Sequence, residues 1–343
     1  MLTILATSTR VAPGLLSWQA WTALREASRV LAGPEGHPQL PALAEAGIAV
    51  EVTGDGPGAL ADSVAAAVAA SAAGSVVWLA PAGAEAPPAE LLAALARAGL
   101  PEAEVRVLHG SRDLPGAHLI DVVTTMNTLR TSCPWDRRQT HESLAPHLLE
   151  EPYEALDALE SGDHQALREE LGDVLLQVVF HARIAADRAA ADDGYTVDDV
   201  ADTLVAKLVR RHPHVFANVP VDSAEDVNRN WEEIKKAERA AKLAASGSAG
   251  AASHPSVLDS VAFGQPALSL AAQLVRRAGR IGYPVAADTD AAEDSDVPVS
   301  DVGEELLRLV AEAAQRGMDP ELELRRVARR LADRVRAWER HQS

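Results

Sequence analysis

Cysteine and aromatic residues are scarce in this chain of 343 residues. The single cysteine, Cys133, excludes an internal disulfide, so the fold does not depend on an oxidising compartment. Aromatic residues make up only 3% of the chain, whereas apolar residues make up 47%. Because alanine and valine supply much of that apolar fraction, we expect cores of small side chains, which suit closely packed helices.

The sequence also lacks any apolar run near the ~20 residues that a membrane span requires. Its first residues, MLTILATSTR, have no basic region ahead of the apolar run, which argues against a secretory signal. An excess of positive charge is absent too: the formal net charge is -18, which argues against binding to duplex nucleic acid. We therefore expect a cytoplasmic protein that binds neither duplex nucleic acid nor a membrane.

Residues 1–117 alternate between short β-like runs and alanine-rich helical stretches. The β-like runs are LTILATS, GIAVEVTG, GSVVWLAP and VRVLHG, and the helical stretches include 60–73 and 88–98. This alternation predicts a small α/β domain with a parallel sheet. No GxGxxG or P-loop motif follows the runs, so nucleotide binding has no support in this part of the chain.

From about residue 120 to 243 the pattern becomes helical. Between 163 and 190, apolar residues recur at spacings of three and four, which predicts one face of a helix. These residues are Leu167, Leu171, Val174, Leu175, Val178, Ala182 and Ala185. Ser161, Gly162 and Asp163 precede them and predict a tight turn between two helices. Further helices are expected over 196–211 and 225–242.

Beyond residue 243 the composition changes again. The small residues of 244–256 predict a linker, with helices expected after it at 266–280 and 320–340. The stretch 288–305 has no basic residue, whereas 320–340 contains seven arginines. We expect the charges of these two segments to face solvent rather than to pair with each other in the first instance.

Two acidic clusters stand on consecutive predicted helices. Glu150, Glu151 and Glu154 lie at helical spacing on the first, and Glu170 and Asp173 on the second. A helical wheel puts Glu170 about 80° and Asp173 about 140° from the centre of the apolar stripe, on the same side. The neighbouring Glu169 lies about 180° away and is expected to face water. A short antiparallel turn would bring both clusters to one level of a helical bundle.

Carboxylates gathered in this way repel one another unless a cation neutralises them. Oxygen ligands without histidine or cysteine favour Mg²⁺ or Mn²⁺ over zinc. A di-iron site would need Glu-x-x-His pairs, and neither cluster has a histidine at that offset. The alternative from spacing alone is that these are surface glutamates of an acidic protein, where they contribute only to solubility.

Four segments of this helical region together resemble the MazG family of nucleoside triphosphate pyrophosphohydrolases. They are CPWDRRQTHESLAPHLLEEPYEALDAL, LREELGDVLLQVVFHARIA, KLVRRHPHVFANV and NWEEIKKAER, within about 120–242. The resemblance implies a mainly α chain whose all-α catalytic domain is a MazG-type four-helix bundle. It also implies a homodimer and Mg²⁺-dependent hydrolysis of NTPs and dNTPs to the monophosphate and pyrophosphate. Cleaning of the nucleotide pool is the expected role.

The same resemblance assigns roles to particular residues. It implies that metal is held by Glu151, Glu154, Glu170 and Asp173. Glu150 is implied as a catalytic residue, either a further ligand or the base that orients water. The implied substrate-binding residues are Lys207, Arg211 and Lys235 for phosphates and Trp231 near the nucleotide.

Two departures from the family pattern affect these expectations. Pro152 falls inside the first acidic motif, where it removes a helical hydrogen bond. The region 257–343 resembles a second, degenerate MazG repeat, in which Asp301 and Glu304 stand in swapped roles and the first acidic motif is missing. We predict an α/β domain at 1–117, the catalytic domain at 118–243, a linker at 244–256 and the degenerate repeat at 257–343.

Two other functions remain open at this point. One is a base-selective, dUTPase-like enzyme of the same superfamily. The other is a nucleotide-binding regulator whose metal site is impaired by Pro152.

Overall fold

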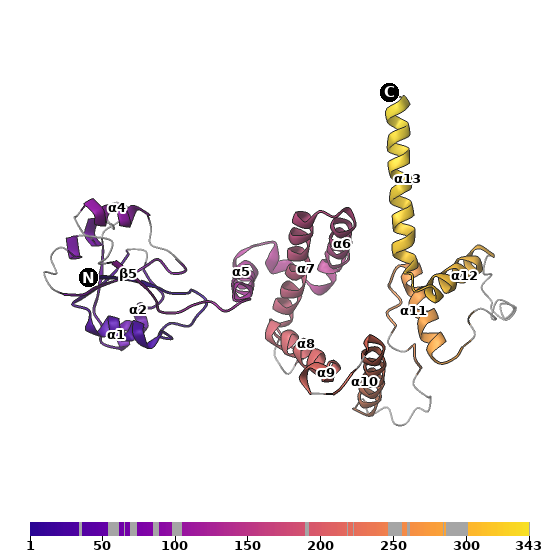
Figure 1. Cartoon of the computed structure of the whole chain (residues 1–343), viewed down its shortest axis with the longest axis horizontal. Helices are drawn as coiled ribbons and strands as arrows, with labels where there is room; N and C mark the ends of the chain where they lie inside the picture. The colour runs from indigo at the N-terminus through magenta and orange to yellow at the C-terminus, as the bar shows by residue number, and fades with distance from the viewer. Residues whose placement is uncertain are drawn as a thin grey trace. The chain divides into compact units, whose positions relative to one another are not determined.

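The computed structural model of the chain is shown in Figure 1. It describes residues 1–33, 36–53, 62–64, 66–68, 74–84, 89–97, 105–188, 192–217, 219–221, 223–245, 256–258, 261–283, 285 and 301–342. Its contacts divide the chain into two units, Met1–Val227 and Asn228–Ser343. The domain boundaries predicted at 117, 243 and 256 stay predictions.

The first unit opens with a parallel five-stranded sheet in the order β3-β2-β4-β1-β5. The strands are β1 (Leu2–Ala6), β2 (Arg29–Ala32), β3 (Val50–Val52), β4 (Val76–Leu79) and β5 (Val105–His109). All residues of the central strands β1 and β4 are buried, as expected for parallel strands covered on both faces. The edge strands β3 and β5 are more exposed and more polar.

Helices cover both faces of this sheet (Figure 1). One face packs Leu5, Val77 and Leu79 against α1 (Trp18–Glu26) and α2 (Leu40–Glu45). The other face packs Ile4 and Trp78 against α4 (Ala89–Arg97) and residues 64–68. The predicted helix at 60–73 lies largely outside the described residues. The predicted small α/β domain with a parallel sheet is confirmed.

The rest of the first unit is helical and centred on α7. Its elements are α5 (His118–Ser132), η2 (Asp136–Arg138), α6 (His141–Ser161), α7 (His164–Ala185), α8 (Val197–Arg211) and α9 (Pro213–Phe216), followed by the start of α10 (Ala224–Ala245). Helix α7 contacts α5, α6 and α8. Its core joins Phe180 and Val179 to Met126 of α5 and Leu144 of α6.

The second unit contains the remainder of α10 with α11 (Ala267–Arg280), α12 (Asp301–Gln315) and α13 (Pro320–Gln342). Helix α11 contacts both α12 and α13. The predicted linker at 244–256 lies mostly outside the described residues. Together the two units confirm the predicted class, a mainly helical chain with an N-terminal α/β domain. Among the described helices, none combines the length and apolar character needed to cross a membrane.

Candidate metal centre

A short turn joins α6 to α7 and sets how their side chains meet. Helix α6 ends at Gly162, whose φ of 76° is left-handed and favours a residue without a side chain. Asp163 then caps α7, because its Oδ1 accepts hydrogen bonds of 3.0 Å from the backbone N–H groups of Gln165 and Ala166. The two helices therefore reverse direction within two residues and lie side by side.

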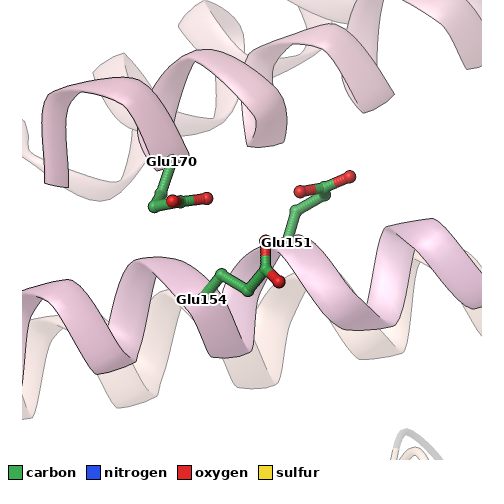
Figure 2. A group of neighbouring side chains, drawn as sticks. All are labelled: Glu151, Glu154 and Glu170. Atoms are coloured by element: carbon green, nitrogen blue, oxygen red, sulfur yellow. The ribbon is translucent and has the colours of Figure 1, made fainter. Parts of the chain in front are cut away.

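Three carboxylates from this helix pair converge. Glu151 and Glu154 extend from α6 and Glu170 from α7, all directed into the space between the helices (Figure 2). Each offers an oxygen, and these oxygens lie within 4.8 Å of one another. Glu151 and Glu170 are half-buried and Glu154 is exposed. We call these three residues the glutamate cluster.

The cluster is electrostatically unfavourable when nothing neutralises it. Burial raises the pKa of Glu151, and the negative charges of Asp173 and Glu154 raise it further. Burial likewise raises the pKa of Glu170, followed by the charges of Glu154, Asp173 and Glu151. A cation bound between the carboxylates would remove this repulsion.

The donor set suits a hard divalent cation. All three groups are carboxylates, and neither histidine nor cysteine belongs to the cluster. Oxygen donors of this kind are those that Mg²⁺ and Mn²⁺ take, whereas zinc sites generally include nitrogen or sulfur. The residues present therefore fit the metal that the sequence predicts.

Asp173 and Glu150 lie beside the cluster. Asp173 is exposed, yet its charge acts on both Glu151 and Glu170, so it lies close to both. Glu150 is exposed and its Oε2 lies 3.5 Å from His147 Nδ1. The roles predicted for these two residues stay predictions.

Glu169 and Glu170 differ as the helical wheel predicts. Glu169 is exposed, and Glu170 is half-buried within the cluster. The predicted apolar stripe is only partly buried, however. Leu171 and Val178 are exposed at 54% and 41%, whereas Val179 and Phe180 are buried. The buried face of α7 is thus rotated toward α5 and the start of α6.

Pro152 does not interrupt α6. The helix continues from His141 to Ser161 with Pro146 and Pro152 inside it, and Glu154 still reaches the cluster. A proline lacks the N–H that would bond the carbonyl four residues earlier, so the helix loses that hydrogen bond. The loss leaves the direction of Glu154 toward Glu170 intact.

Gln177 is a member of the site that the sequence did not predict. Its side chain is only 4% exposed, and its Nε2 donates to Glu151 Oε1 at 3.4 Å. Gln177 lies one helical turn after Asp173 on α7, and this spacing is the only feature of the sequence that points to it. Because an amide donor favours the charged carboxylate, Gln177 partly opposes the rise in the pKa of Glu151.

The predicted phosphate contacts Lys207 and Arg211 both lie on α8, four residues apart and half-buried. Within the described part of the chain, Lys207 makes no ion pair with an acidic side chain. Its charge is therefore available to an anionic ligand. The predicted binding roles of both residues stay predictions.

Trp231 and Lys235 lie on α10 beyond Val227 and so belong to the second unit. The Lys235 Nζ lies 4.9 Å from the centroid of the Trp231 ring, a cation–π contact. The structure therefore brings these two predicted residues to each other.

Histidines near the helical core have structural partners. His141 and His181 stack with ring centroids 5.1 Å apart, and their Nδ1 atoms lie 2.8 Å from each other. His212 links the end of α8 to α9, and its Nδ1 lies 2.7 Å from the carbonyl oxygen of Leu208. Neither pair belongs to the glutamate cluster.

Comparison with known proteins adds to this geometry. Residues 139–216, which contain the whole glutamate cluster, match the family model of the MazG nucleotide pyrophosphohydrolase domain. The chain is 45% identical over 248 residues to an uncharacterised 26.1 kDa protein of Streptomyces cacaoi, covering 72% of this chain and 93% of that one.

Several relatives carry functional names, and two of them illustrate the match. One is a nucleoside triphosphate pyrophosphohydrolase of Mycolicibacterium smegmatis, 42% identical, with 64% of this chain and 68% of that one covered. The other is the nucleoside triphosphate pyrophosphohydrolase/pyrophosphatase MazG of Thermotoga maritima, 36% identical, with 64% of this chain and 84% of that one covered. This chain therefore belongs to the MazG family of nucleotide pyrophosphohydrolases.

Proposed function

We propose that this protein hydrolyses nucleoside and deoxynucleoside triphosphates to the monophosphate and pyrophosphate, with Mg²⁺ bound at the glutamate cluster. The observation that carries the proposal is the convergence of Glu151, Glu154 and Glu170 from two helices, inside the segment that matches the MazG domain. Asp173, whose charge acts on two of them, completes the proposed ligand set. Cleaning of the nucleotide pool is the role that we propose for this activity.

The reaction needs three things from the site. Bound Mg²⁺ would supply charge neutralisation at the phosphate oxygens and a more acidic water. Attack of water on the α-phosphorus forms one P–O bond and breaks the α–β anhydride bond, so pyrophosphate leaves. The attacking water gives up a proton in this step, and the exposed carboxylate of Glu150, one residue from Glu151, is the proposed acceptor.

Cationic side chains are needed for the charge on the leaving pyrophosphate. Lys207 and Arg211 on α8 are the proposed phosphate contacts within the first unit. On α10, Lys235 is a third proposed phosphate contact, and Trp231 is proposed to lie against the nucleotide.

A homodimer is the proposed assembly, and α8 supports it. No residue of α8 is buried. Even its apolar residues Leu204, Val205 and Leu208 are exposed, at 46%, 57% and 44%. Apolar side chains that recur along one helix without cover favour an interface. Size-exclusion chromatography of the full-length protein with light-scattering detection would measure its mass in solution. The mass of a monomer would contradict this part of the proposal.

The competing function is a nucleotide-binding regulator with an impaired metal site. It depends on Pro152 turning Glu154 away from the other ligands. The cluster is formed in spite of Pro152, which favours the enzyme. A base-selective enzyme remains an alternative that differs only in the range of its substrates.

The test is a panel of the common NTPs and dNTPs, with damaged nucleotides added, each incubated with the full-length protein and Mg²⁺. We expect monophosphate and pyrophosphate in equal amounts, and no product when EDTA replaces Mg²⁺. Turnover of a single nucleobase would favour the base-selective alternative. Release of nucleoside diphosphate and inorganic phosphate would contradict the proposal. So would undiminished turnover in EDTA, or nucleotide binding without any product.

A further inference from the structure

A cleft of 480 Å³ opens at the edge of the N-terminal sheet where β1, β4 and β5 end. Three chain segments line it, each following one of these strands. Thr7, Ser8 and Arg10 come after β1, Gly83 comes after β4, and Ser111 and Arg112 come after β5. No residue of the glutamate cluster takes part, so the cleft is separate from the proposed catalytic site.

The position of the cleft follows from the topology of the sheet. Strands β1 and β4 are neighbours, and α1, which follows β1, packs on one face. Helix α4, which follows β4, packs on the other face. The chain therefore leaves two adjacent strands in opposite directions, which opens a crevice at their carboxyl ends. In open parallel α/β sheets this switch point is where ligands bind.

Part of the cleft is built from groups that already satisfy one another. The Ser8 hydroxyl donates to Asp113 and accepts from the Arg10 backbone N–H at 2.9 Å. The Arg10 guanidinium forms ion pairs with Asp113 and Asp121, and its side chain is only 16% exposed. These contacts tie the loop after β1 to the loop after β5 and hold that wall of the cleft in place.

Other lining groups have hydrogen-bonding capacity to spare. In the described parts of the chain, the side chains of Arg112 and His109 have neither a hydrogen-bond partner nor an ion pair. The Ser111 oxygen accepts from the Ser8 backbone N–H at 2.9 Å, but its own proton has no acceptor there. A cation and two further donors thus line the cleft unengaged, and all three complement a negatively charged oxygen.

We propose that this cleft binds a small organic molecule that carries a phosphate or carboxylate group. The volume lies within the range of about 300–1,000 Å³ that is typical of small-molecule sites, and it exceeds what a bare inorganic anion would fill. Arg112, His109 and Ser111 would bind the charged group, and the rest of the molecule would lie against Gly83 and Ala84.

The experiment is calorimetric titration of the full-length protein in EDTA, with AMP as the phosphate probe and citrate as the carboxylate probe. EDTA removes the divalent metal of the proposed catalytic site. Because AMP is also a product of the proposed reaction, the Arg112→Ala variant is needed to separate binding in the cleft from binding at the catalytic site. We expect saturable binding of at least one probe, and the probe that binds identifies the charged group. Arg112→Ala should weaken that binding about tenfold or more, because it removes an unpaired cation from the cleft.

The matched control is Arg25→Ala, which removes the same charge from α1 at a position that does not line the cleft. It should bind the probe like the wild type. Arg112 is exposed and unpaired among the described residues, so its replacement should leave the melting temperature unchanged. Arg112→Lys, which keeps the charge, should recover part of the affinity. Equal affinity in Arg112→Ala and Arg25→Ala, or no saturable binding of either probe to the wild type, would overturn the proposal.

Discussion

Glu169 and Glu170 are neighbours on α7 with opposite surroundings. Glu169 is exposed, whereas Glu170 faces Glu151 and Glu154 across the gap between α6 and α7. A rotation of about 100° per residue is enough to separate a solvated charge from one held among like charges. When metal is absent, the charge of Glu170 should therefore lower the stability of the fold, whereas the charge of Glu169 should have little effect.

The first prediction concerns Glu170→Gln without metal. The pKa of Glu170 is raised above its ordinary value of 4.5, by burial first and then by the neighbouring charges. The folded state therefore favours the protonated carboxyl, and this stability is lost as the pH rises through the raised pKa. In EDTA at pH 7, Glu170→Gln should be more stable than the wild type, and the difference should vanish well below the ordinary pKa.

Urea unfolding in EDTA at the two pH values measures this effect, with Glu169→Gln as the control. Glu169 is exposed and outside the cluster, so its replacement should change stability by less than about 0.5 kcal/mol at either pH. Equal stability of Glu170→Gln and the wild type at pH 7 would mean that the cluster is not strained by charge.

At the residue scale, the sequence alone could separate Glu170 from Glu169, because helical periodicity sets the angle of each side chain. It could not find Gln177, since a lone amide in an apolar stretch reads as an interruption of that stretch. The partner that explains Gln177 is Glu151, which lies 26 residues away on α6. Contacts of this kind depend on how two helices pack, and the period of one helix carries no information about them.

At the scale of elements, the connection between α6 and α7 controls the site. Gly162 ends α6 in a left-handed conformation, and Asp163 accepts two backbone hydrogen bonds at the start of α7. The turn fixes how the carboxylates on α6 and α7 are placed relative to one another. The Asp163 cap therefore contributes to the geometry of the glutamate cluster as well as to the stability of α7.

The second prediction concerns this cap. Asp163→Ala should lower the free energy of unfolding by about 1 kcal/mol, because two N–H groups at the start of α7 lose their acceptor. Asp163→Asn should cost much less, since asparagine is an equally good capping residue. Chemical denaturation of the two variants checks this, and equal losses in both would show that the negative charge matters more than the hydrogen bonds.

Helix bounds were the most predictable feature of the elements. The helices expected over 196–211 and 320–340 are observed as Val197–Arg211 and Pro320–Gln342, because long amphipathic periods are strong signals. Strand β2 was missed, since RVLA is too short to stand out between two helices. The exposure of Leu171 and Val178 was also missed, because periodicity identifies an apolar face without saying what covers it.

At the scale of the whole molecule, the described residues of the two units differ in their capacity to hold a metal. Among the described residues, the group of acidic side chains placed to hold a metal lies on α6 and α7, and none lies in the second unit. Helix α12, where the second repeat would place its acids, does form at Asp301–Gln315. The residues from 286 to 300, where the sequence lacks the first acidic motif, lie outside the described part.

The third prediction is that the degenerate repeat at 257–343 does not carry the chemistry. Asp301→Asn and Glu304→Gln, made together in the full-length chain, should leave the rate of pyrophosphate release within about twofold of the wild type, as expected of changes outside the metal site. Matched circular dichroism spectra would show that both proteins are folded. A large loss of turnover in the folded double variant would mean that the C-terminal repeat takes part in catalysis.

The most direct test of the central claim, that the carboxylates between α6 and α7 bind the metal for NTP hydrolysis, compares two single substitutions in the full-length protein. Pyrophosphate release is measured at saturating Mg²⁺ for the wild type, Glu170→Gln and Glu169→Gln. Glu170→Gln should be slower by ~10²-fold or more, because it removes a charged ligand from the cluster. Glu169→Gln should be close to the wild type. Equal losses in the two variants, or an undiminished rate in Glu170→Gln, would contradict the assignment of the active site.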